Sequence, residues 1–345
     1  MSNVRVIIWG LGAMGSGMAR MLIAKQGIEI VGAIDTHPEK AHKKLTQVLG
    51  VSAPDVVVAS EPKEVIKTGA ADIVLVCTGS FTREVYPQLE LVAKARINCI
   101  TIAEEMAYPK AQEPTLAESL HTMFAEAGVT LLGTGINPGF VLDSLIIALT
   151  GVCTHVESIK AVRVNDLSPF GPTVMRTQGV GTTPEEFHSG IAAGNIVGHV
   201  GFPESMSLIA AALGMKLDRI EQVKEPIISN THRETPHVKV APGMVAGCKH
   251  IAYGYRGDKL VLTLEHPQQI RPEAESVLTG DYIYITGTPS INMAITPEIP
   301  GGIGTIAMTV NMIPAVINAA PGLVTMADLP IPRALLGDIS ALIKR

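Results

Sequence analysis

The chain has 345 residues, of which 47% are hydrophobic and 17% charged, and its formal net charge is −5. This length suits two domains, and the apolar content supports large buried cores and excludes a disordered chain. The lack of a basic block and the aromatic content of 4% argue against a nucleic-acid partner.

A short apolar strand over residues 4–9 leads directly into a glycine-rich loop. The loop reads Gly10-Leu11-Gly12-Ala13-Met14-Gly15, and a helix-like run over 18–24 follows. Gly10 permits a tight turn, Gly12 lets a pyrophosphate approach the backbone, and Gly15 lets the helix pack close to the strand. With Ala13 and Met14 between these glycines, we expect the loop to bind a dinucleotide. The alternative is a glycine-rich turn that binds no nucleotide.

The next strand, over 28–34, ends at an acidic residue, Asp35, which lies 20 residues after Gly15. A carboxylate there accepts hydrogen bonds from the ribose 2′-OH and repels a 2′-phosphate, so the sequence favours NAD over NADP. Because Thr36, His37 or Lys40 could tolerate the phosphate, NADP remains the alternative cofactor. Asp35 could also only cap a helix that begins near Pro38.

Strands and helices continue to alternate through the first half of the chain. We expect helices at 38–49, 62–67 and 81–95 and one that ends near Gly128, and strands at 56–58, 72–77, 98–102 and 129–133. Short apolar strands separated by helices indicate a parallel sheet covered on both faces. The fold class is therefore α/β, with a Rossmann-type doubly wound dinucleotide-binding domain over residues 1–149.

The pattern changes in the second half, where strands follow one another. Strands are expected at 158–165, 220–223, 244–255, 260–266 and 282–286, with helical patches at 184–187 and 205–213. Tight turns such as 256–259 indicate a second, α+β domain with a mixed or antiparallel sheet over residues 150–300. One face of this sheet would cover the catalytic cleft, and the other could pair with a second subunit. Residues 301–345 are expected to form a helical segment that packs back on the first domain.

The cysteines and the apolar stretches indicate a soluble, cytoplasmic protein. Four cysteines form no C-x-x-C pair, so we expect buried thiols in a reducing compartment and neither a disulfide framework nor a zinc site. The most apolar stretch, 303–320, contains threonines, asparagines and a proline, which favours a buried helix over a membrane span. The first strand begins at once, which leaves no room for a signal peptide.

Polar residues follow three strands at the edge where an open parallel sheet binds ligands. Thr78, Gly79 and Ser80 follow the fourth strand and could line the ribose on the nicotinamide side. Glu104 and Glu105 follow the fifth and are the strongest acid/base candidates. Adjacent residues of an extended chain cannot both point into one site, and we favour Glu104. In the alternative reading, these glutamates only cap or solvate the next helix.

Residues of the second half and of the third strand end offer a substrate site. Arg163 and Asn165 share one face of a strand, and an arginine with an asparagine is a natural carboxylate receptor. An arginine on a surface edge strand is an equally good explanation. Asn137 and Phe140, on the glycine-rich turn after the sixth strand, would face the same cleft. His199 and His266 each follow an apolar run and could equally be structural histidines. The spacing of the histidines predicts no metal site, and the lack of a G-x-S-x-G elbow argues against a serine hydrolase.

Taken in order, these motifs resemble a known family. They are the loop from Gly10 to Gly15 and the segments 77–80, 104–109 and 135–140, joined by 163–165, 265–267, 311–314 and 321–323. The chain resembles the dihydrodipicolinate reductase-like dehydrogenases, and within them the group of 2,4-diaminopentanoate dehydrogenases and native amine dehydrogenases. The resemblance covers nearly the whole chain, and the segments with Glu104-Glu105 and with Asn137 are its most specific parts.

The resemblance implies an NAD(P)-linked oxidative deamination of 2,4-diaminopentanoate to 2-amino-4-oxopentanoate, within ornithine breakdown, by a homodimer. Glu104 would activate water and manage the leaving ammonia. Asn137, Arg163, Asn165 and His266 would hold the carboxylate and the 2-amino group, and Phe140 would wall the pocket. Three other functions stay open: a dehydrogenase of simple amines, another amino-acid dehydrogenase of this superfamily, and an NAD-binding sensor without turnover. A sensor would not need Glu104.

Overall fold

The computed structural model describes residues 2–344, and the chain divides into two compact units. Unit 1 consists of Met1–Phe140 and Gly301–Arg345, and unit 2 consists of Val141–Pro300. The first division therefore falls after Phe140, earlier than the expected boundary after Leu149. Residues 301–345 belong to the same unit as the glycine-rich loop.

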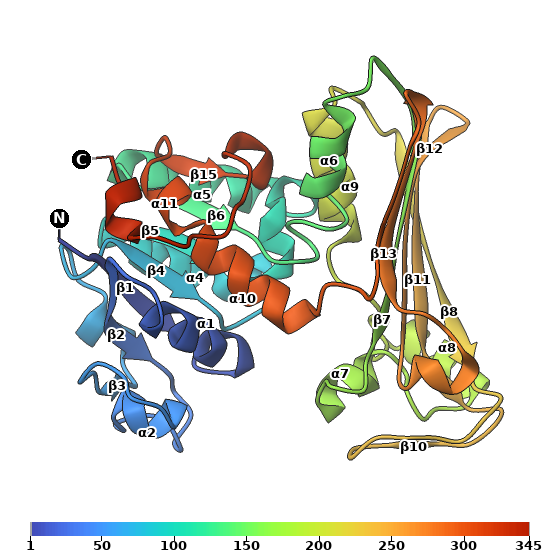
Figure 1. Ribbon diagram of the computed structural model, residues 1–345, viewed down its shortest axis with the longest axis horizontal. Helices are drawn as coiled ribbons and strands as arrows, with labels where there is room; N and C mark the ends of the chain where they lie inside the picture. Colours follow the sequence, from blue (N-terminus) through green and yellow to red (C-terminus); the bar gives the residue numbers. More distant parts are fainter. Residues whose placement is uncertain (1, 345) are drawn as a thin grey trace. The chain divides into compact units, whose positions relative to one another are not determined.

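Unit 1 is built on a seven-stranded parallel sheet with the strand order β15-β6-β5-β4-β1-β2-β3 (Figure 1). The strands are β1 (Val4–Trp9), β2 (Ile28–Ile34), β3 (Val58–Ala59), β4 (Ile73–Val76), β5 (Asn98–Thr101), β6 (Thr130–Gly133) and β15 (Gly322–Val324). The helices are α1 (Ala13–Ile23), α2 (Leu45–Leu49), α3 (Pro62–Val65), α4 (Thr82–Lys94), α5 (Pro114–Ala127), α10 (Gly301–Asn311) and α11 (Ile313–Ile317).

The central strand β1 shows why helices cover both faces of this sheet. Its side chains alternate, so Val6 and Ile8 enter one hydrophobic core while Ile7 and Trp9 enter another. The first core takes apolar side chains from α1, α10 and α11, and the second takes them from α4 and α5. This arrangement confirms the Rossmann-type α/β fold of the dinucleotide-binding half.

The segment 301–345 completes unit 1 in a way that the sequence did not reveal. Helix α10 packs against α1, as expected of a helical segment. The three residues of β15 then pair with β6 in parallel, from Gly322 opposite Thr130 to Val324 opposite Leu132. A strand this short carries no readable alternation of apolar and polar residues, so it was missed.

Unit 2 contains a six-stranded mixed sheet with the order β14-β13-β7-β12-β11-β8. Strands β12 and β7 run parallel, and every other pair in this sheet is antiparallel. Its strands are β7 (His155–Asp166), β8 (Arg219–Ile228), β11 (Val245–Arg256), β12 (Lys259–Gln269), β13 (Gly280–Thr288) and β14 (Ile291–Ile295), and β9 (Arg233–Glu234) pairs separately with β10 (Lys239–Val240). Its helices are α6 (Ser144–Thr150), α7 (Pro172–Thr177), α8 (Pro184–Ala192) and α9 (Phe202–Ala212). The expected α+β domain with a mixed sheet is thus confirmed.

Two elements differ from the expectation for local reasons. The helix expected over 38–49 is reduced to α2, because the chain turns at residues 37–41 and His42 takes a left-handed conformation, with φ of 64°, that ends any helix. The segment 166–181 is rich in Ser, Pro, Gly and Thr, which indicates a loop, but it contains α7, which starts with Pro172 in its first turn.

The described residues carry no obvious membrane or disulfide feature. Among residues 2–344, no helix is both long enough and apolar enough to cross a bilayer. Cys77, Cys99, Cys153 and Cys248 are free thiols, and burial raises the pKa of the Cys77 thiol to about 12.

Candidate active site

The glycine-rich loop of unit 1 has the geometry that a dinucleotide needs. Gly10 has φ of +95°, and a Cβ atom there would lie 2.7 Å from the Cys77 carbonyl oxygen. A Cβ at Gly15 would lie 1.8 Å from the Gly10 carbonyl oxygen, so the helix can approach the loop only because Gly15 has no side chain. A Cβ at Gly12 would meet nothing within 4 Å, so this side of the loop is open. Gly12 is also the N-cap of α1, and no side chain caps this helix, which leaves its N–H groups for a phosphate.

Asp35 closes the loop from the end of β2. Its Oδ2 accepts the N–H of Leu11 at 2.8 Å, and its Oδ1 accepts the N–H of His37 at 2.8 Å. Lys40 Nζ lies 3.3 Å from Oδ2. Burial acts to raise the pKa of Asp35, but the two backbone hydrogen bonds and Lys40 outweigh it and lower the pKa. The carboxylate is therefore ionised at neutral pH, as a ribose acceptor must be.

Beside Asp35 lies a groove that bears on the choice of cofactor. It has a volume of about 410 Å³, and its lining includes Ser16, Lys40, Lys43 and Gln47. Lys40 and Lys43 bring positive charge to this groove, Glu39 brings one negative charge, and Lys40 pairs with the carboxylate that would repel a 2′-phosphate. The sequence analysis named Thr36, His37 and Lys40 as residues that could tolerate the phosphate, and the lining of this groove adds Lys43.

The segment after β4 is held by the first turn of α4. Glu84 Oε2 accepts the N–H of Ser80 at 3.2 Å, and Thr78 Oγ1 bonds to Gln88 Oε1. A Cβ at Gly79 would lie 2.8 Å from Glu84 Oε2, so a larger residue there would displace this glutamate. Thr78, Gly79 and Ser80 thus form a short, fixed turn at the carboxyl edge of the sheet.

Glu104 and Glu105 follow β5 in a 3-10 turn, and the structure gives them different environments. Glu105 is buried. Its Oε2 accepts the backbone N–H of Thr82, the first residue of α4, at 2.7 Å. Gln112 Nε2 lies 3.4 Å from the other oxygen of Glu105. This carboxylate therefore accepts a hydrogen bond from the start of α4, the helix that precedes it in the chain, whereas the alternative reading of the pair had placed it at the next helix.

Glu104 is half-buried and has a raised pKa. Burial is the main cause; a backbone N–H and the Ser80 side chain act in the opposite direction, and the Glu84 charge adds to the increase. A raised pKa makes a carboxylate a stronger base and so favours its use in taking and returning a proton. Of the two glutamates, Glu104 is the one that is available for acid/base chemistry.

The turn after β6 is tightly constrained within unit 1. Gly139 has φ of +125°, and a Cβ there would lie 2.4 Å from the Gly135 amide nitrogen. The Asn137–Pro138 peptide bond is cis, and Asn137 itself is half-buried. Phe140 packs partly buried against the core that contains α1 and α10.

In unit 2, Arg163 and Asn165 lie on the buried face of β7. Their exposed fractions are 2% and 7%, which excludes the reading of a surface edge-strand arginine. His266 of the neighbouring strand β12 donates from Nε2 to Asn165 Oδ1 at 2.8 Å. Three predicted site residues therefore lie together on this face.

Arg163 has a buried acidic partner that the sequence did not indicate. Its Nη1 lies 2.5 Å from Asp281 Oδ1, and its Nη2 donates to the Ile299 carbonyl at 2.6 Å. Asp281 stands directly opposite Arg163 in the β7–β13 register. Burial raises the pKa of Asp281, and the nearby Arg163 guanidinium limits the increase.

His199 and His266 belong to a cluster with a third histidine, His250. The ring centroids of His199 and His266 are 4.8 Å apart, and Phe202 stacks near both His199 and His250. The backbone N–H of His199 donates to Nδ1 of the His250 ring at 3.0 Å. The neutral His250 ring therefore carries its proton on Nε2. We call His199, His250 and His266 the histidine cluster.

The histidine cluster is uncharged at neutral pH. Burial lowers the pKa of His199 to about 3 and that of His250 to about 4, and it lowers the pKa of His266 well below the ordinary value. As neutral rings, these histidines can donate and accept hydrogen bonds but carry no positive charge.

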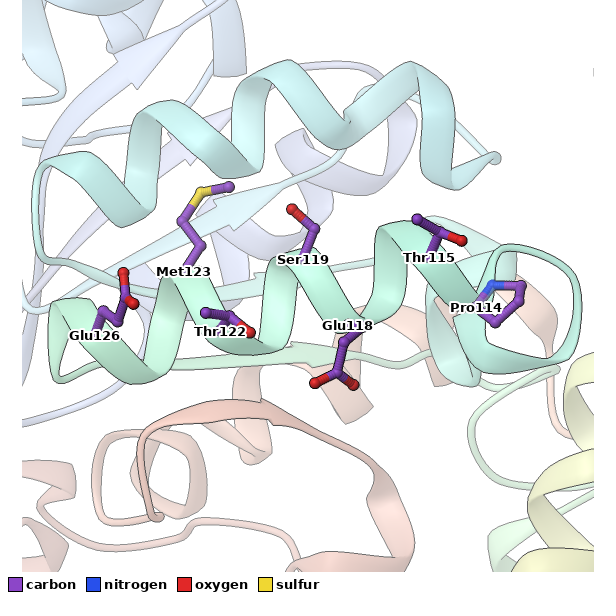
Figure 2. Close-up of a pocket in the computed structure, with 7 residues that line it drawn as sticks. All are labelled: Pro114, Thr115, Glu118, Ser119, Thr122, Met123 and Glu126. Carbon is purple, nitrogen blue, oxygen red and sulfur yellow. The ribbon is translucent and has the colours of Figure 1, made fainter.

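A further surface feature lies away from all of these residues. A groove of about 710 Å³ runs along α5, lined by Pro114, Thr115, Glu118, Ser119, Thr122, Met123 and Glu126 (Figure 2). Short polar side chains and two glutamates border it, and no predicted site residue lines it. We assign it no role in catalysis.

Comparison with known proteins decides the family. The model of the 2,4-diaminopentanoate dehydrogenase C-terminal domain matches residues 140–345, and that of the dihydrodipicolinate reductase N-terminus matches residues 4–102. The 2,4-diaminopentanoate dehydrogenase of Acetoanaerobium sticklandii is 51% identical over 349 residues, which cover 99% of this chain and 98% of the relative. The chain belongs to the 2,4-diaminopentanoate dehydrogenase family.

More distant relatives of this family member are amine dehydrogenases. The amine dehydrogenase of Streptomyces virginiae is 24% identical, with 96% of this chain and 98% of the relative covered. The solved structure of the amine dehydrogenase from Mycobacterium smegmatis has a TM-score of 0.86 and 27% identity, with 97% of this chain and 98% of that chain covered. The family expectation is confirmed, as are the fold class and the enzyme class, an NAD(P)-dependent dehydrogenase that acts on amino groups.

Two residues of this family member escaped the sequence analysis, Asp281 and His250. Asp281 lies 118 positions from Arg163, and no local pattern connects them. His250 faces His266 across the β11–β12 hairpin. Counting back from the turn at 256–259 would have paired His250 with Glu265, because a bulge after Gly254 shifts the register by one residue.

Proposed function

We propose that this enzyme oxidatively deaminates 2,4-diaminopentanoate to 2-amino-4-oxopentanoate, with release of ammonia, and that the reaction also runs in reverse as a reductive amination. The observation that carries the substrate assignment is the 51% identity, over nearly the full length, to a protein of that name. The buried group of Arg163, Asn165 and His266 supports it, because it suits a substrate with a carboxylate.

In this proposal unit 1 holds the coenzyme and supplies the proton chemistry. The loop from Gly10 to Gly15, with Ala13 and Met14, receives the pyrophosphate, Asp35 receives the adenosine ribose, and Thr78, Gly79 and Ser80 border the second ribose. When bound, the nicotinamide accepts the hydride from C4 of the substrate. Glu104 takes a proton from the water that attacks the resulting iminium carbon and returns a proton to the departing ammonia.

Unit 2 supplies the anchor for the other end of the substrate. Arg163 and Asn165 bind the carboxylate, and His266 and His199 complete the polar surroundings as neutral rings. We assign Asn137 to the 2-amino group and Phe140 to the pocket wall. Such contacts far from C4 orient the reacting carbon, so they contribute to the rate as well as to affinity.

The test is NADH or NADPH formation at alkaline pH with a panel of diamino acids, monoamino acids and alkyl amines. We expect turnover of 2,4-diaminopentanoate, with weak or absent turnover of short alkyl amines. Reaction with short alkyl amines alone would overturn the assignment in favour of an amine dehydrogenase. Binding of coenzyme without turnover of any amine would indicate a sensor.

The same assay addresses the coenzyme. We propose NAD as the preferred coenzyme because Asp35 is ionised and accepts hydrogen bonds where a 2′-phosphate would stand. Lys40 and Lys43 in the neighbouring groove would permit some use of NADP. A larger kcat/KM with NADP than with NAD would contradict the preference.

We also propose that the enzyme is a homodimer that pairs through the sheet of unit 2. Register aligns Tyr282, Val162, Glu265, Ile251 and Val223 in a row across five strands, on the face opposite to Arg163. Val223 in this row is 42% exposed, and Tyr284 in the next row is 41% exposed. Aromatic and aliphatic side chains on both sides of Glu265, on an open sheet face, suit an interface.

The place of the reaction follows from the family resemblance. We propose that the step belongs to the breakdown of ornithine, as that resemblance implies. The four free thiols suit the reducing cytoplasm.

A further inference from the structure

Arg163 has spare hydrogen-bonding capacity. A guanidinium offers five N–H donors. Among residues 2–344, the structure gives Arg163 two partners, Asp281 Oδ1 and the Ile299 carbonyl. An arginine that served only the fold would have its donors used by the protein, because unmade hydrogen bonds of a buried cation are costly.

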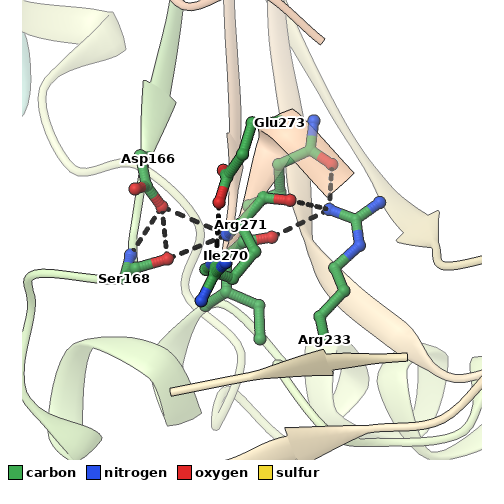
Figure 3. Close-up of polar contacts among 7 residues, drawn as sticks. Asp166, Ser168, Arg233, Ile270, Arg271 and Glu273 are labelled. Atoms are coloured by element: carbon green, nitrogen blue, oxygen red, sulfur yellow. Dashed lines mark hydrogen bonds and ion pairs between the residues drawn. The ribbon is translucent and has the colours of Figure 1, made fainter. Parts of the chain in front are cut away.

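The same unit contains a buried arginine, Arg233, that has more partners within the protein than Arg163 has. Arg233 donates from Nε to Ser229 Oγ at 2.8 Å, and from Nη1 to Gln269 Oε1 at 2.7 Å and to the Ile270 carbonyl at 2.8 Å. Its Nη2 lies 2.9 Å from Glu275 Oε2. Figure 3 shows acceptors around this guanidinium, beside a second group in which Asp166 and Ser168 hold the backbone N–H of Arg271. Arg233 is therefore a structural arginine, and it provides an internal reference for Arg163.

Asp281 is fixed more firmly than an ordinary ion-pair partner. It has no exposed surface, and it stands on β13 in register with Arg163. Its Oδ1 meets Arg163, while its Oδ2 accepts the N–H of Ile299 at 2.9 Å. Because Ile299 also accepts from Arg163 Nη2, the three residues form a closed ring of contacts that allows the guanidinium one orientation.

We propose that Asp281 is the positioning residue of Arg163: it fixes the guanidinium so that the remaining N–H donors receive the substrate carboxylate, and it balances the arginine charge. The balance matters because 2,4-diaminopentanoate carries two ammonium groups and one carboxylate, and an unbalanced guanidinium would repel this cation. The inference rests on the proposed function, since it assigns the way in which that substrate is recognised.

The test compares a ligand that has the carboxylate with one that lacks it. Butane-1,3-diamine is 2,4-diaminopentanoate without its carboxyl group, and its inhibition constant can be measured against the natural reaction. In the Asp281→Asn variant we expect the KM for 2,4-diaminopentanoate to rise about tenfold or more, with a smaller fall in kcat. The inhibition constant of the diamine should change by less than about threefold.

Two further variants make the result specific. Glu275→Gln makes the same carboxylate-to-amide change beside Arg233, and it should leave the KM and the inhibition constant unchanged once folded protein is isolated. In an Arg163→Gln background, adding Asp281→Asn should raise the KM by less than about twofold, because the residue through which Asp281 acts is gone. If Asp281→Asn does not fold, Asp281→Glu keeps the charge and should show the same selective effect.

The outcomes separate the two proposals. If the unchanged enzyme does not oxidise 2,4-diaminopentanoate, the proposed function fails. If it does, and the Asp281 variants weaken both ligands equally or neither ligand, the pair is purely structural and the inference is overturned. A selective loss of the carboxylate-bearing ligand supports it.

Discussion

Two adjacent glutamates show how far neighbouring residues can diverge in chemistry. The Glu105 carboxylate accepts a hydrogen bond from the backbone N–H of Thr82 at the start of α4. Glu104 is half-buried and has a raised pKa. The choice of Glu104 rested at first on the geometry of an extended chain. The structure supplies a firmer reason, because the Glu105 carboxylate is already bound to the start of α4.

The Glu104→Gln variant should lose about 10²- to 10⁴-fold in kcat while it still binds NADH, since an amide cannot accept the proton of the attacking water. Steady-state rates and a fluorescence titration with NADH measure the two effects. In the unchanged enzyme, kcat/KM for oxidation should fall as the pH falls through the raised pKa of Glu104, because the base must be ionised.

Glu105→Gln is the matched control for this prediction. We expect it to lower the free energy of unfolding by about 1–2 kcal/mol, because the N–H of Thr82 loses a charged acceptor. Turnover of the folded protein should persist. The opposite pattern, a fully stable Glu105→Gln protein without activity, would transfer the catalytic role to Glu105.

The period-2 pattern of β7 predicted that Arg163 and Asn165 share a face, but it could not predict their partners. Successive side chains of a strand point to opposite faces of its sheet, so the residues that share a face can be read from that strand's own sequence. The acid that meets Arg163 and the histidine that meets Asn165 come from strands more than 100 residues away, where pairing depends on the tertiary fold.

Among the helices and strands, the longer and regular ones could be predicted from the sequence. Very short strands and the position of a β-bulge could not. Strands β1, β2 and β4 and helices α4 and α5 were expected near their observed positions. The three-residue β15 and the bulge in the β11–β12 hairpin leave no signal in a single sequence. The bulge also decides that His250 faces His266, which the strand patterns alone do not indicate.

The histidine cluster predicts an acid sensitivity of unit 2. In the unfolded chain a histidine has a pKa near 6.5, whereas in the native protein those of His199 and His250 are about 3 and about 4. Between these values the unfolded chain binds more protons. The free energy of unfolding should therefore fall as the pH falls from about 6.5 to about 4, by up to about 1.4 kcal/mol per pH unit for each histidine.

Urea unfolding at a series of pH values measures this dependence. In the His250→Gln variant, the free energy of unfolding should depend less steeply on pH, by the contribution of one proton. Replacement of the exposed His188 by glutamine is the control within the same unit. A slope that is the same with and without His250 would contradict the assignment of a neutral, buried ring.

For the whole molecule, the open face of the unit 2 sheet is the feature with the largest consequence. On the face opposite to Arg163, Val223 is 42% exposed and Tyr284 is 41% exposed. Antiparallel sheets commonly keep one face in water, but such faces are usually polar. On this face, Tyr282, Val162 and Tyr284 lie next to the ion pair between Lys160 and Glu265.

Tyr284→Lys should convert a dimer to monomers, because the new charge would lie beside Lys160 and would have to be buried in the interface. Light scattering after size exclusion measures the mass. Leu278→Lys changes a side chain that is 79% exposed and lies outside the strands, and it should leave the mass unchanged. A monomeric parent protein, or a Tyr284→Lys protein that stays dimeric, would remove this face from consideration.

The strand β15 has a consequence for biosynthesis. The ribosome makes the first 140 residues of unit 1, then the 160 residues of unit 2, and only then the segment with α10 and β15. Until that segment emerges, β6 stands as a bare sheet edge and α1 lacks the helix that packs on it. The coenzyme-binding unit should therefore mature last, although its translation starts first, and nascent chains that stop before residue 301 should be the ones most in need of chaperones.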